Sequence, residues 1–243
     1  MLLNGISIKG SYHNKNQDCY ASRNIGNAYI VVVSDGLGSK ELSELGSEAL
    51  CQSACDILSE FREEIDDMSP EIFIRLVHEK WLYKLRGRRI RDCYATMLIF
   101  LVLSEKIIAV RLGDGFVAFW ADDEVRILFD QKEDYFSNET DCLTENLAEE
   151  KIQCIEFPYR KFYGGILCSD GVGIGNMTEN EIKRFTIDFI KEYRTYTEEE
   201  MIKEIEVILH HLSSTKANAS VLSSAPGQSF NQSSISFIIS SSV

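Results

Sequence analysis

Three aspartates in this 243-residue chain follow apolar runs and immediately precede a glycine: Asp35, Asp114 and Asp170. A continuous apolar run that ends in turn residues is typical of a buried strand, so we expect each carboxylate at the end of a strand. The neighbouring glycines let the backbone approach a ligand closely. Oxygen-rich clusters with few histidine or cysteine ligands suit Mg²⁺ or Mn²⁺. We therefore predict one acidic, cation-binding cluster at the rim of a sheet.

The alternative explanation for any one of these pairs is an ordinary turn at the end of a strand. For a single pair that explanation would be the better one. The polar segment Asn16-Gln17-Asp18, taken alone, is likewise typical of a surface turn. The recurrence of the pattern at three strand ends, together with this segment, favours a functional cluster.

Composition and charge narrow the class of protein. With 44% hydrophobic residues and three prolines, the chain can bury a large core. A formal net charge of −13 argues against nucleic acid or an anionic membrane as a partner. It is compatible with a phosphorylated side chain held by metal ions, because bound cations reverse the local field.

The seven cysteines are scattered, with no CxxC pair. This usage is typical of reduced thiols, and no segment approaches the length of a membrane span. We expect a soluble, cytoplasmic protein.

Helices and strands are grouped along the chain. Apolar residues recur at spacings of three and four over 43–65, which predicts an amphipathic helix, and Ser69-Pro70 supplies an N-cap and a first-turn proline for a second helix. The period becomes strand-like between 95 and 129, where we predict an antiparallel meander. Further strands are expected over 6–13, 29–33, 151–157, 164–169 and 233–240, and capping boxes at Thr178 and Thr197 predict two later helices.

Because the strands and helices are not interleaved as βαβ units, the order favours an α+β fold rather than a Rossmann-like sheet. No internal boundary is evident, so residues 1–243 are expected to form a single domain.

Two groups of basic residues have a structural explanation. The arginines within 86–91 follow the second helix, where they would complement the helix dipole or be solvated. Phosphate binding is the alternative role for them. His210 and His211 lie at the end of a later predicted helix, and we interpret them as capping or surface residues rather than ligands.

Laid out in order, the motifs resemble those of the metal-dependent PP2C (PPM) Ser/Thr protein phosphatases, and more narrowly their short bacterial branch. The resemblance runs from Gly10 to Ser240, and six short motifs in the right order make it specific. The matching segments are Gly10–Asp18, Val33–Gly38, Tyr94–Leu98, Gly113–Gly115, Phe136–Thr140 and Ser169–Gly171, with Ser39 and Leu45–Ser47 continuing the branch pattern.

The resemblance implies an antiparallel β-sandwich flanked by helices on both sides, with a two-metal site at one end of the sandwich. It implies hydrolysis of phosphomonoesters on phosphoserine or phosphothreonine proteins by a metal-activated water, without a covalent intermediate. Two Mn²⁺ or Mg²⁺ ions about 4 Å apart would lower the pKa of a bridging water and hold the phosphoryl oxygens. The enzyme would oppose a bacterial Ser/Thr kinase.

The metal ligands implied by the resemblance are Asp18, Asp35, Gly36, Asp114, Asp170 and Asn231. Asp35 would bridge the two ions, and Gly36 would offer its backbone carbonyl. Asp170 and Asn231 would hold one ion, while Asp18 would bind or orient a metal-bound water. Asp114 with Asp170 would hold a third, weaker ion.

Two positions depart from the pattern of the better-known members. Asn231 stands where the family usually has an aspartate, so the site loses one negative charge and weaker binding of one ion is expected. His13 stands in place of the phosphate-binding arginine, with Lys15 close by. The two residues are the implied phosphate-binding pair. His13 is also the implied catalytic partner of Asp35, and could contact the phosphate or protonate the leaving serine oxygen.

Two other functions are compatible with these residues. A pseudophosphatase or regulatory binding module would keep the fold without catalysis, and Asn231 is the feature that favours it. A structural metal-binding domain, calcium-dependent and without hydrolytic activity, is the second alternative.

Overall fold

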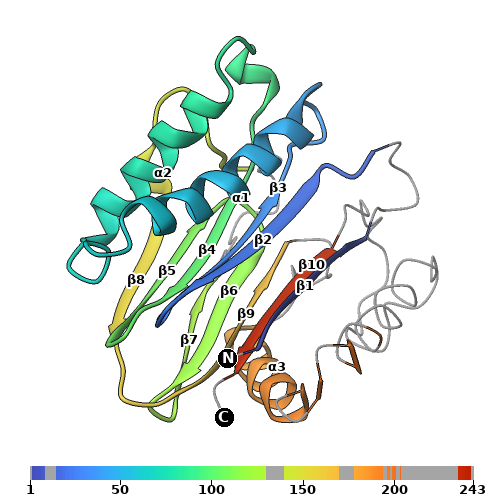
Figure 1. The fold of residues 1–243 in the computed structure, drawn as a ribbon. Helices are drawn as coiled ribbons and strands as arrows, with labels where there is room; N and C mark the ends of the chain where they lie inside the picture. The colour runs from blue at the N-terminus through green and yellow to red at the C-terminus, as the bar shows by residue number, and fades with distance from the viewer. Residues whose placement is uncertain are drawn as a thin grey trace, which may run out of the picture.

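The computed structural model describes residues 2–8, 15–129, 140–169, 178–193, 196–197, 199–200, 203 and 235–241. Two antiparallel sheets pack face to face, with helices on the outer face of each sheet (Figure 1). This confirms the predicted α+β class and the sandwich flanked by helices on both sides.

The first sheet contains β2 (Asp18–Ile25), β3 (Ala28–Asp35), β4 (Met97–Val102), β5 (Lys106–Leu112) and β8 (Gln153–Pro158), in that order. The second sheet has the order β1 (Leu2–Ile8), β10 (Ile235–Ser241), β9 (Phe162–Cys168), β6 (Phe116–Ala121) and β7 (Glu124–Leu128). The helices are α1 (Ser43–Glu60), α2 (Pro70–Lys84) and α3 (Glu179–Tyr193), with short 3₁₀ turns η1 (Ile90–Asp92) and η2 (Glu149–Lys151).

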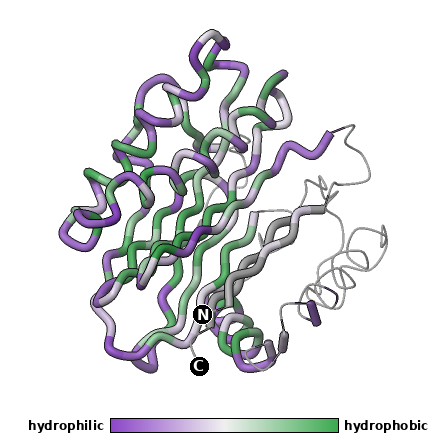
Figure 2. The backbone as a smooth tube through the Cα atoms, in the orientation of Figure 1, coloured by the Kyte–Doolittle hydropathy of each residue, from purple (hydrophilic) through white to green (hydrophobic). Residues whose placement is uncertain are grey.

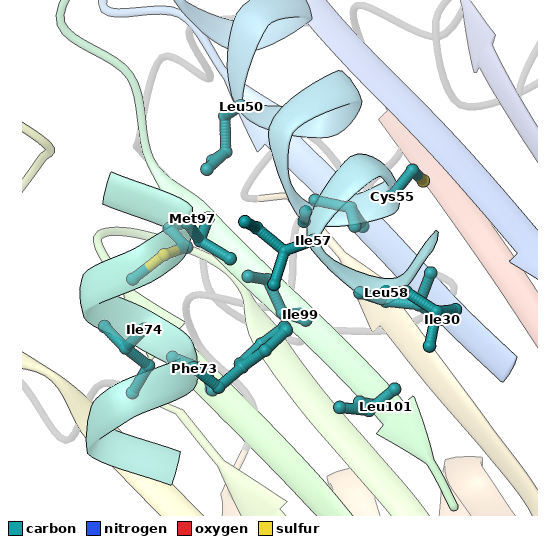
Figure 3. Packing of buried hydrophobic residues seen from close by; sticks show 14 of the residues in the cluster. Ile30, Leu50, Cys55, Ile57, Leu58, Phe73, Ile74, Met97, Ile99 and Leu101 are labelled. Carbon is teal, nitrogen blue, oxygen red and sulfur yellow. The ribbon is translucent and has the colours of Figure 1, made fainter. Parts of the chain in front are cut away.

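Both faces of the central strands β3, β4 and β5 of the first sheet are buried. Alternate residues of β3 point in opposite directions: Ile30 and Val32 pack against α1 and α2, whereas Val31 and Val33 face the second sheet. This explains why the strand is a continuous apolar run rather than an alternating one. Figure 3 shows the packing on the helix side, and Figure 2 shows hydrophobic residues gathered on the central strands.

The core between the sheets depends on one glycine. Phe100 of β4 lies against Phe119 of β6, with ring centroids 5.5 Å apart. A Cβ at Gly165 of β9 would lie 2.6 Å from the Phe100 ring. The missing side chain at Gly165 therefore leaves the space that this aromatic ring fills.

The predicted meander over 95–129 is wrong in one respect. β4 pairs with β5 and β6 pairs with β7, but the two hairpins belong to different sheets. The chain crosses between the sheets at Gly113-Asp114-Gly115, where both glycines have φ of +98°. Residues with side chains rarely adopt this conformation, so the two glycines permit the turn that carries the chain into the second sheet.

Local capping signals are confirmed more closely than strand limits. The Ser69 hydroxyl accepts a hydrogen bond from the Ile72 amide at 3.4 Å at the start of α2. The carboxylate of Glu181 accepts a hydrogen bond from the Thr178 amide at 2.8 Å, as its capping box predicts. The first strand covers Leu2–Ile8 and overlaps the predicted strand 6–13 over 6–8, while 9–13 lie outside the described residues. α1 ends at Glu60 rather than near residue 65.

The Thr197 capping box forms as well, with its amide 2.9 Å from the Glu200 carboxylate. Most of the helix predicted after it, including His210 and His211, lies outside the described residues. In the described part of the chain, no helix is both long enough and apolar enough to cross a membrane.

Candidate active site

Asp18 and Asp35 lie directly opposite each other, because β2 begins at Asp18 where the antiparallel β3 ends at Asp35. Directly opposite residues of an antiparallel pair project from the same face, with Cβ atoms about 4.5–5.5 Å apart. Asp35 shares its face with Val33, which packs between the sheets. The two carboxylates therefore face the space between the sheets at one end of the sandwich. Asp18 is buried and Asp35 is half-buried.

The second sheet reaches the same place through Ser169, which follows the last residue of β9. The buried Ser169 hydroxyl lies 3.5 Å from Oδ2 of Asp18 and donates a hydrogen bond to it. Residues far apart in the chain thus meet where the two sheets end. Asp170, the next residue, lies outside the described residues.

The backbone on either side of the aspartate pair is held by hydrogen bonds. Thr96 accepts a hydrogen bond from the Asp35 amide through Oγ1 and donates its own amide to the Asp35 carbonyl, both at 2.8 Å. The Gln17 carbonyl accepts from the Gly36 amide at 3.1 Å and from the Ser47 hydroxyl at 2.6 Å. These hydrogen bonds from β3, the neighbouring loops and α1 together fix the backbone positions of Asp18 and Asp35.

Gly36 cannot carry a side chain in this arrangement. A Cβ at this position would lie 2.6 Å from the carbonyl oxygen of Ser43 and 2.8 Å from that of Gln17. Contacts this short do not occur between real Cβ atoms and backbone oxygens. The bare backbone of Gly36 is therefore required for the loop after β3 to pack beside the start of β2.

Asp114 lies at the same end of the sandwich, because β5 runs in the same direction as β3, with β4 between the two strands. The Thr140 hydroxyl donates a hydrogen bond to Asp114 Oδ2 at 2.5 Å. The buried Arg111 donates from Nε to the Gly115 carbonyl at 2.8 Å, which braces the turn that carries Asp114. The structure thus puts Asp35 at the end of β3 and Asp114 just after the end of β5, at the same end of the first sheet, and a shared cation site formed by them stays a prediction.

Arg111 and Thr140 were not among the predicted site residues. An arginine inside the otherwise apolar run of β5 was the available signal for Arg111, because a buried charge requires partners. Thr140 closes the Phe136–Thr140 motif, whose other residues lie outside the described part of the chain. No local pattern indicates that its hydroxyl reaches Asp114.

Lys15 is held at the start of α1. Its ammonium group lies 2.7 Å from the Glu44 carboxylate and its side chain is largely exposed. Burial would raise the pKa of Glu44, but hydrogen bonds from Lys15 and from the backbone outweigh it and lower the pKa below its usual value. The pair orients Lys15 on the rim beside Asn16 and Gln17.

Of the predicted site residues, the structure brings Asp18, Asp35 and Gly36 together and puts Asp114 at the same end of the sandwich. His13, Asp170 and Asn231 lie outside the described residues. Within the described ranges, no group of three or more His, Cys, Asp or Glu side chains is arranged to hold a metal ion. The paired carboxylates are nevertheless the oxygen donors that hard divalent cations prefer.

Comparisons with known proteins identify the family of the chain. Residues 11–218 match the sequence model of the family described as protein phosphatase 2C. The chain belongs to the protein phosphatase 2C family. No curated protein sequence matches it significantly.

Solved structures of bacterial protein phosphatases share its fold. A bacterial serine phosphatase superposes with a TM-score of 0.67 at 16% identity, covering 99% of this chain and 97% of the other. The serine/threonine phosphatase Stp1 from Staphylococcus aureus gives 0.64 at 15% identity, covering 99% and 94%. RsbX, solved in complex with magnesium, gives 0.58 at 13% identity, covering 98% and 92%. At these identities the likeness establishes the phosphatase 2C fold of the chain.

Proposed function

We propose that this phosphatase 2C family member is a metal-dependent Ser/Thr phosphoprotein phosphatase. The observation that carries the proposal is the register of β2 and β3, which sets Asp18 opposite Asp35 on the face between the sheets. Family membership gives this carboxylate pair its chemical context. Together they support hydrolysis of a phosphomonoester at the end of the sandwich.

The donor set fits Mn²⁺ or Mg²⁺, because it consists of carboxylate, amide and carbonyl oxygens. Asp18 and Asp35 would bind the cations together with the Gly36 carbonyl. Asp170 and Asn231 would complete one site, and Asp114 with Asp170 would hold a third, weaker ion. When bound, such cations neutralise charge on the phosphoryl group and acidify water for in-line attack.

Residues near the start of the chain would bind the substrate phosphate and assist departure of the leaving group. His13 and Lys15 would bind the phosphate of the substrate, with Lys15 at the start of α1, where it contacts Glu44. His13 would either contact the phosphate or protonate the leaving serine oxygen, since histidine is a common general acid. The chain would not need a covalent intermediate.

We further propose that residues 1–243 act as one phosphatase domain in the cytoplasm, opposing a bacterial Ser/Thr kinase. The pairing of β1 with β10, which joins the two ends of the chain, supports a single domain. A phosphoserine or phosphothreonine protein is the expected substrate.

Hydrolysis of p-nitrophenyl phosphate and of a phosphothreonine peptide tests the proposal. We expect turnover with Mn²⁺ or Mg²⁺, loss of turnover with a chelator, and a fall of at least about 100-fold in kcat for Asp35→Asn. Asp188→Asn is the matched control, because Asp188 lies on the exposed face of α3 beside Arg184. Turnover that persists in Asp35→Asn or in the chelator would contradict the proposal.

The second candidate function is a pseudophosphatase or regulatory binding module, which Asn231 favours. In the same assay, an increase in turnover on Asn231→Asp would indicate an active enzyme with a weakened metal site. An inactive native chain that gains activity on Asn231→Asp would indicate a pseudophosphatase.

A further inference from the structure

A compact cationic segment follows α2. Four arginines, Arg86, Arg88, Arg89 and Arg91, fall within six residues, and no acidic residue lies between Tyr83 and Arg91. All four side chains are exposed. In a chain with a net charge of −13, this segment is a concentrated patch of the opposite sign. We call residues 86–91 the arginine segment.

The arginine segment lies at the active-site end of the molecule. The residues just after it bind the loop that follows Asp35: the Asp92 carbonyl accepts from the Leu42 amide at 2.9 Å, and the Tyr94 carbonyl accepts from the Leu37 amide at 3.0 Å. Figure 1 shows the C-terminal end of α2 and the connection from β3 to α1 at the same end of the sandwich. The connection itself carries a further cation, Lys40, whose Nζ lies 4.8 Å from the centroid of the Tyr94 ring.

The backbone presents these arginines in a defined conformation. Leu85 before the segment and Cys93 after it are buried. Backbone hydrogen bonds of 3.0 Å from Arg88 to Leu85 and 2.9 Å from Asp92 to Arg89 close two successive turns. The backbone of the segment is therefore anchored at both ends, so little backbone entropy would be lost when a ligand binds.

The local contacts leave the patch strongly positive. Asp92 lies 3.4 Å from Arg89 and offsets one charge. The Arg86 guanidinium stacks over the Tyr83 ring at 4.4 Å, an arrangement that keeps its planar fork of N–H donors for carboxylate or phosphate oxygens. Lys80 and Lys84 of α2 pair instead with acidic residues of α1, Lys84 with Asp56 at 2.8 Å.

We propose that the arginine segment is a docking surface for acidic residues that flank the phosphorylated residue of the protein substrate. The inference rests on the proposed phosphatase function and adds a substrate preference to it. The rest of this acidic chain repels an acidic segment, so a local positive field beside the active site both attracts and orients such a substrate.

Peptide kinetics test this preference. Two phosphothreonine peptides are compared, one flanked by glutamates and one by alanines, and kcat/KM is measured for each at low salt. We expect the acidic peptide to be preferred about tenfold, because several exposed ion pairs form together. Replacing all four arginines by glutamine should bring the ratio close to one, while replacing them by lysine should restore most of it. At 1 M salt, where the Debye length is about 3 Å, the wild-type preference should disappear.

Arg160→Gln with Lys161→Gln is the matched control. These exposed cations lie between β8 and β9, at the opposite end of the sandwich (Figure 1). The control should keep the wild-type ratio. An equal ratio for wild type and the glutamine variant would overturn the inference even if the enzyme is active.

Absence of hydrolysis of either peptide would count against the proposed phosphatase function and not against the docking surface. In that case fluorescence anisotropy with the labelled acidic peptide decides the matter. Binding that the four glutamines weaken by about tenfold would support docking. Equal binding of the peptide by wild type and by the glutamine variant would overturn the docking proposal. Tighter binding of the protein to RNA or to phosphatidylserine vesicles than to the peptide would overturn it as well.

Discussion

Gly46 illustrates how one missing side chain supports the loops around the site. It lies near the start of α1, and a Cβ there would be 1.8 Å from the carbonyl oxygen of Cys93. The Trp81 indole of α2 donates a hydrogen bond to the Gly46 carbonyl at 3.0 Å. The glycine thus lets α1, α2 and the segment before β4 meet closely.

Gly46→Ala should destabilise the protein by about 1–3 kcal/mol, because the backbone of Cys93 has to move. In an ordinary solvated helix the same change would stabilise by up to about 1 kcal/mol, so the sign of the effect is decisive. Urea unfolding measures it. Gly38→Ala is the control, since a Cβ there meets only the end of the Gln17 side chain at 3.8 Å. A more stable Gly46→Ala variant would contradict this packing.

At the same scale, part of the site was predictable from sequence. The apolar runs correctly put Asp35 at a strand end. The two-residue hairpin turn at Gly26-Asn27 sets the register of β2 and β3, and this register places Asp35 opposite Asp18. Two-residue turns fix register. The contact between Thr140 and Asp114 was not predictable, because it joins residues 26 positions apart through tertiary packing.

Between elements, Asp56 of α1 joins three parts of the helix-covered sheet. Its carboxylate lies 3.3 Å from Arg23 of β2 and 2.8 Å from Lys84 of α2. Burial would raise the pKa of Asp56, but the hydrogen bonds from Lys84 and Arg23 outweigh it and lower the pKa below its usual value. The ionised form is therefore the one that stabilises the native state.

Asp56→Asn should lower the free energy of unfolding by about 1 kcal/mol at pH 7, since two partly buried ion pairs are lost. The folded-state pKa is depressed, so the stabilising effect is fully present above the unfolded pKa of about 3.9 and is lost as the pH falls through the folded value. Urea unfolding at pH 7 and pH 3 checks this. The difference between wild type and variant should shrink at pH 3, and a difference independent of pH would contradict the assignment.

Element types were predicted better than their assembly. Capping residues at Ser69 and Thr178 act locally, so the sequence pattern located those helix starts. The assignment of β5 and β6 to different sheets was missed, because strand periodicity is the same in a meander and in two separate hairpins. The pair of glycines at positions 113 and 115 was the only local sign of the crossing.

Over the whole molecule, the candidate site depends on the sandwich being assembled. Asp18 and Asp35 come from the first sheet, whereas Ser169 leads out of the second and contacts Asp18. The order of elements predicted an α+β fold, but the face-to-face sandwich followed from the family resemblance, since periodicity does not specify which faces pack together. A cation bound at this junction would join the sheets and stabilise the native state by mass action.

Mn²⁺ binding to the aspartate pair tests this account most directly. Mn²⁺ is titrated into wild type, Asp18→Asn, Asp35→Asn and the double variant, with free Mn²⁺ followed by electron paramagnetic resonance. We predict that each single change weakens the tightest binding by at least about tenfold. The loss of Mn²⁺ binding free energy in the double variant should be smaller than the sum of the losses in the two single variants, because both carboxylates serve one site. Unchanged Mn²⁺ affinity in both single variants would contradict a metal site at the opposed ends of β2 and β3.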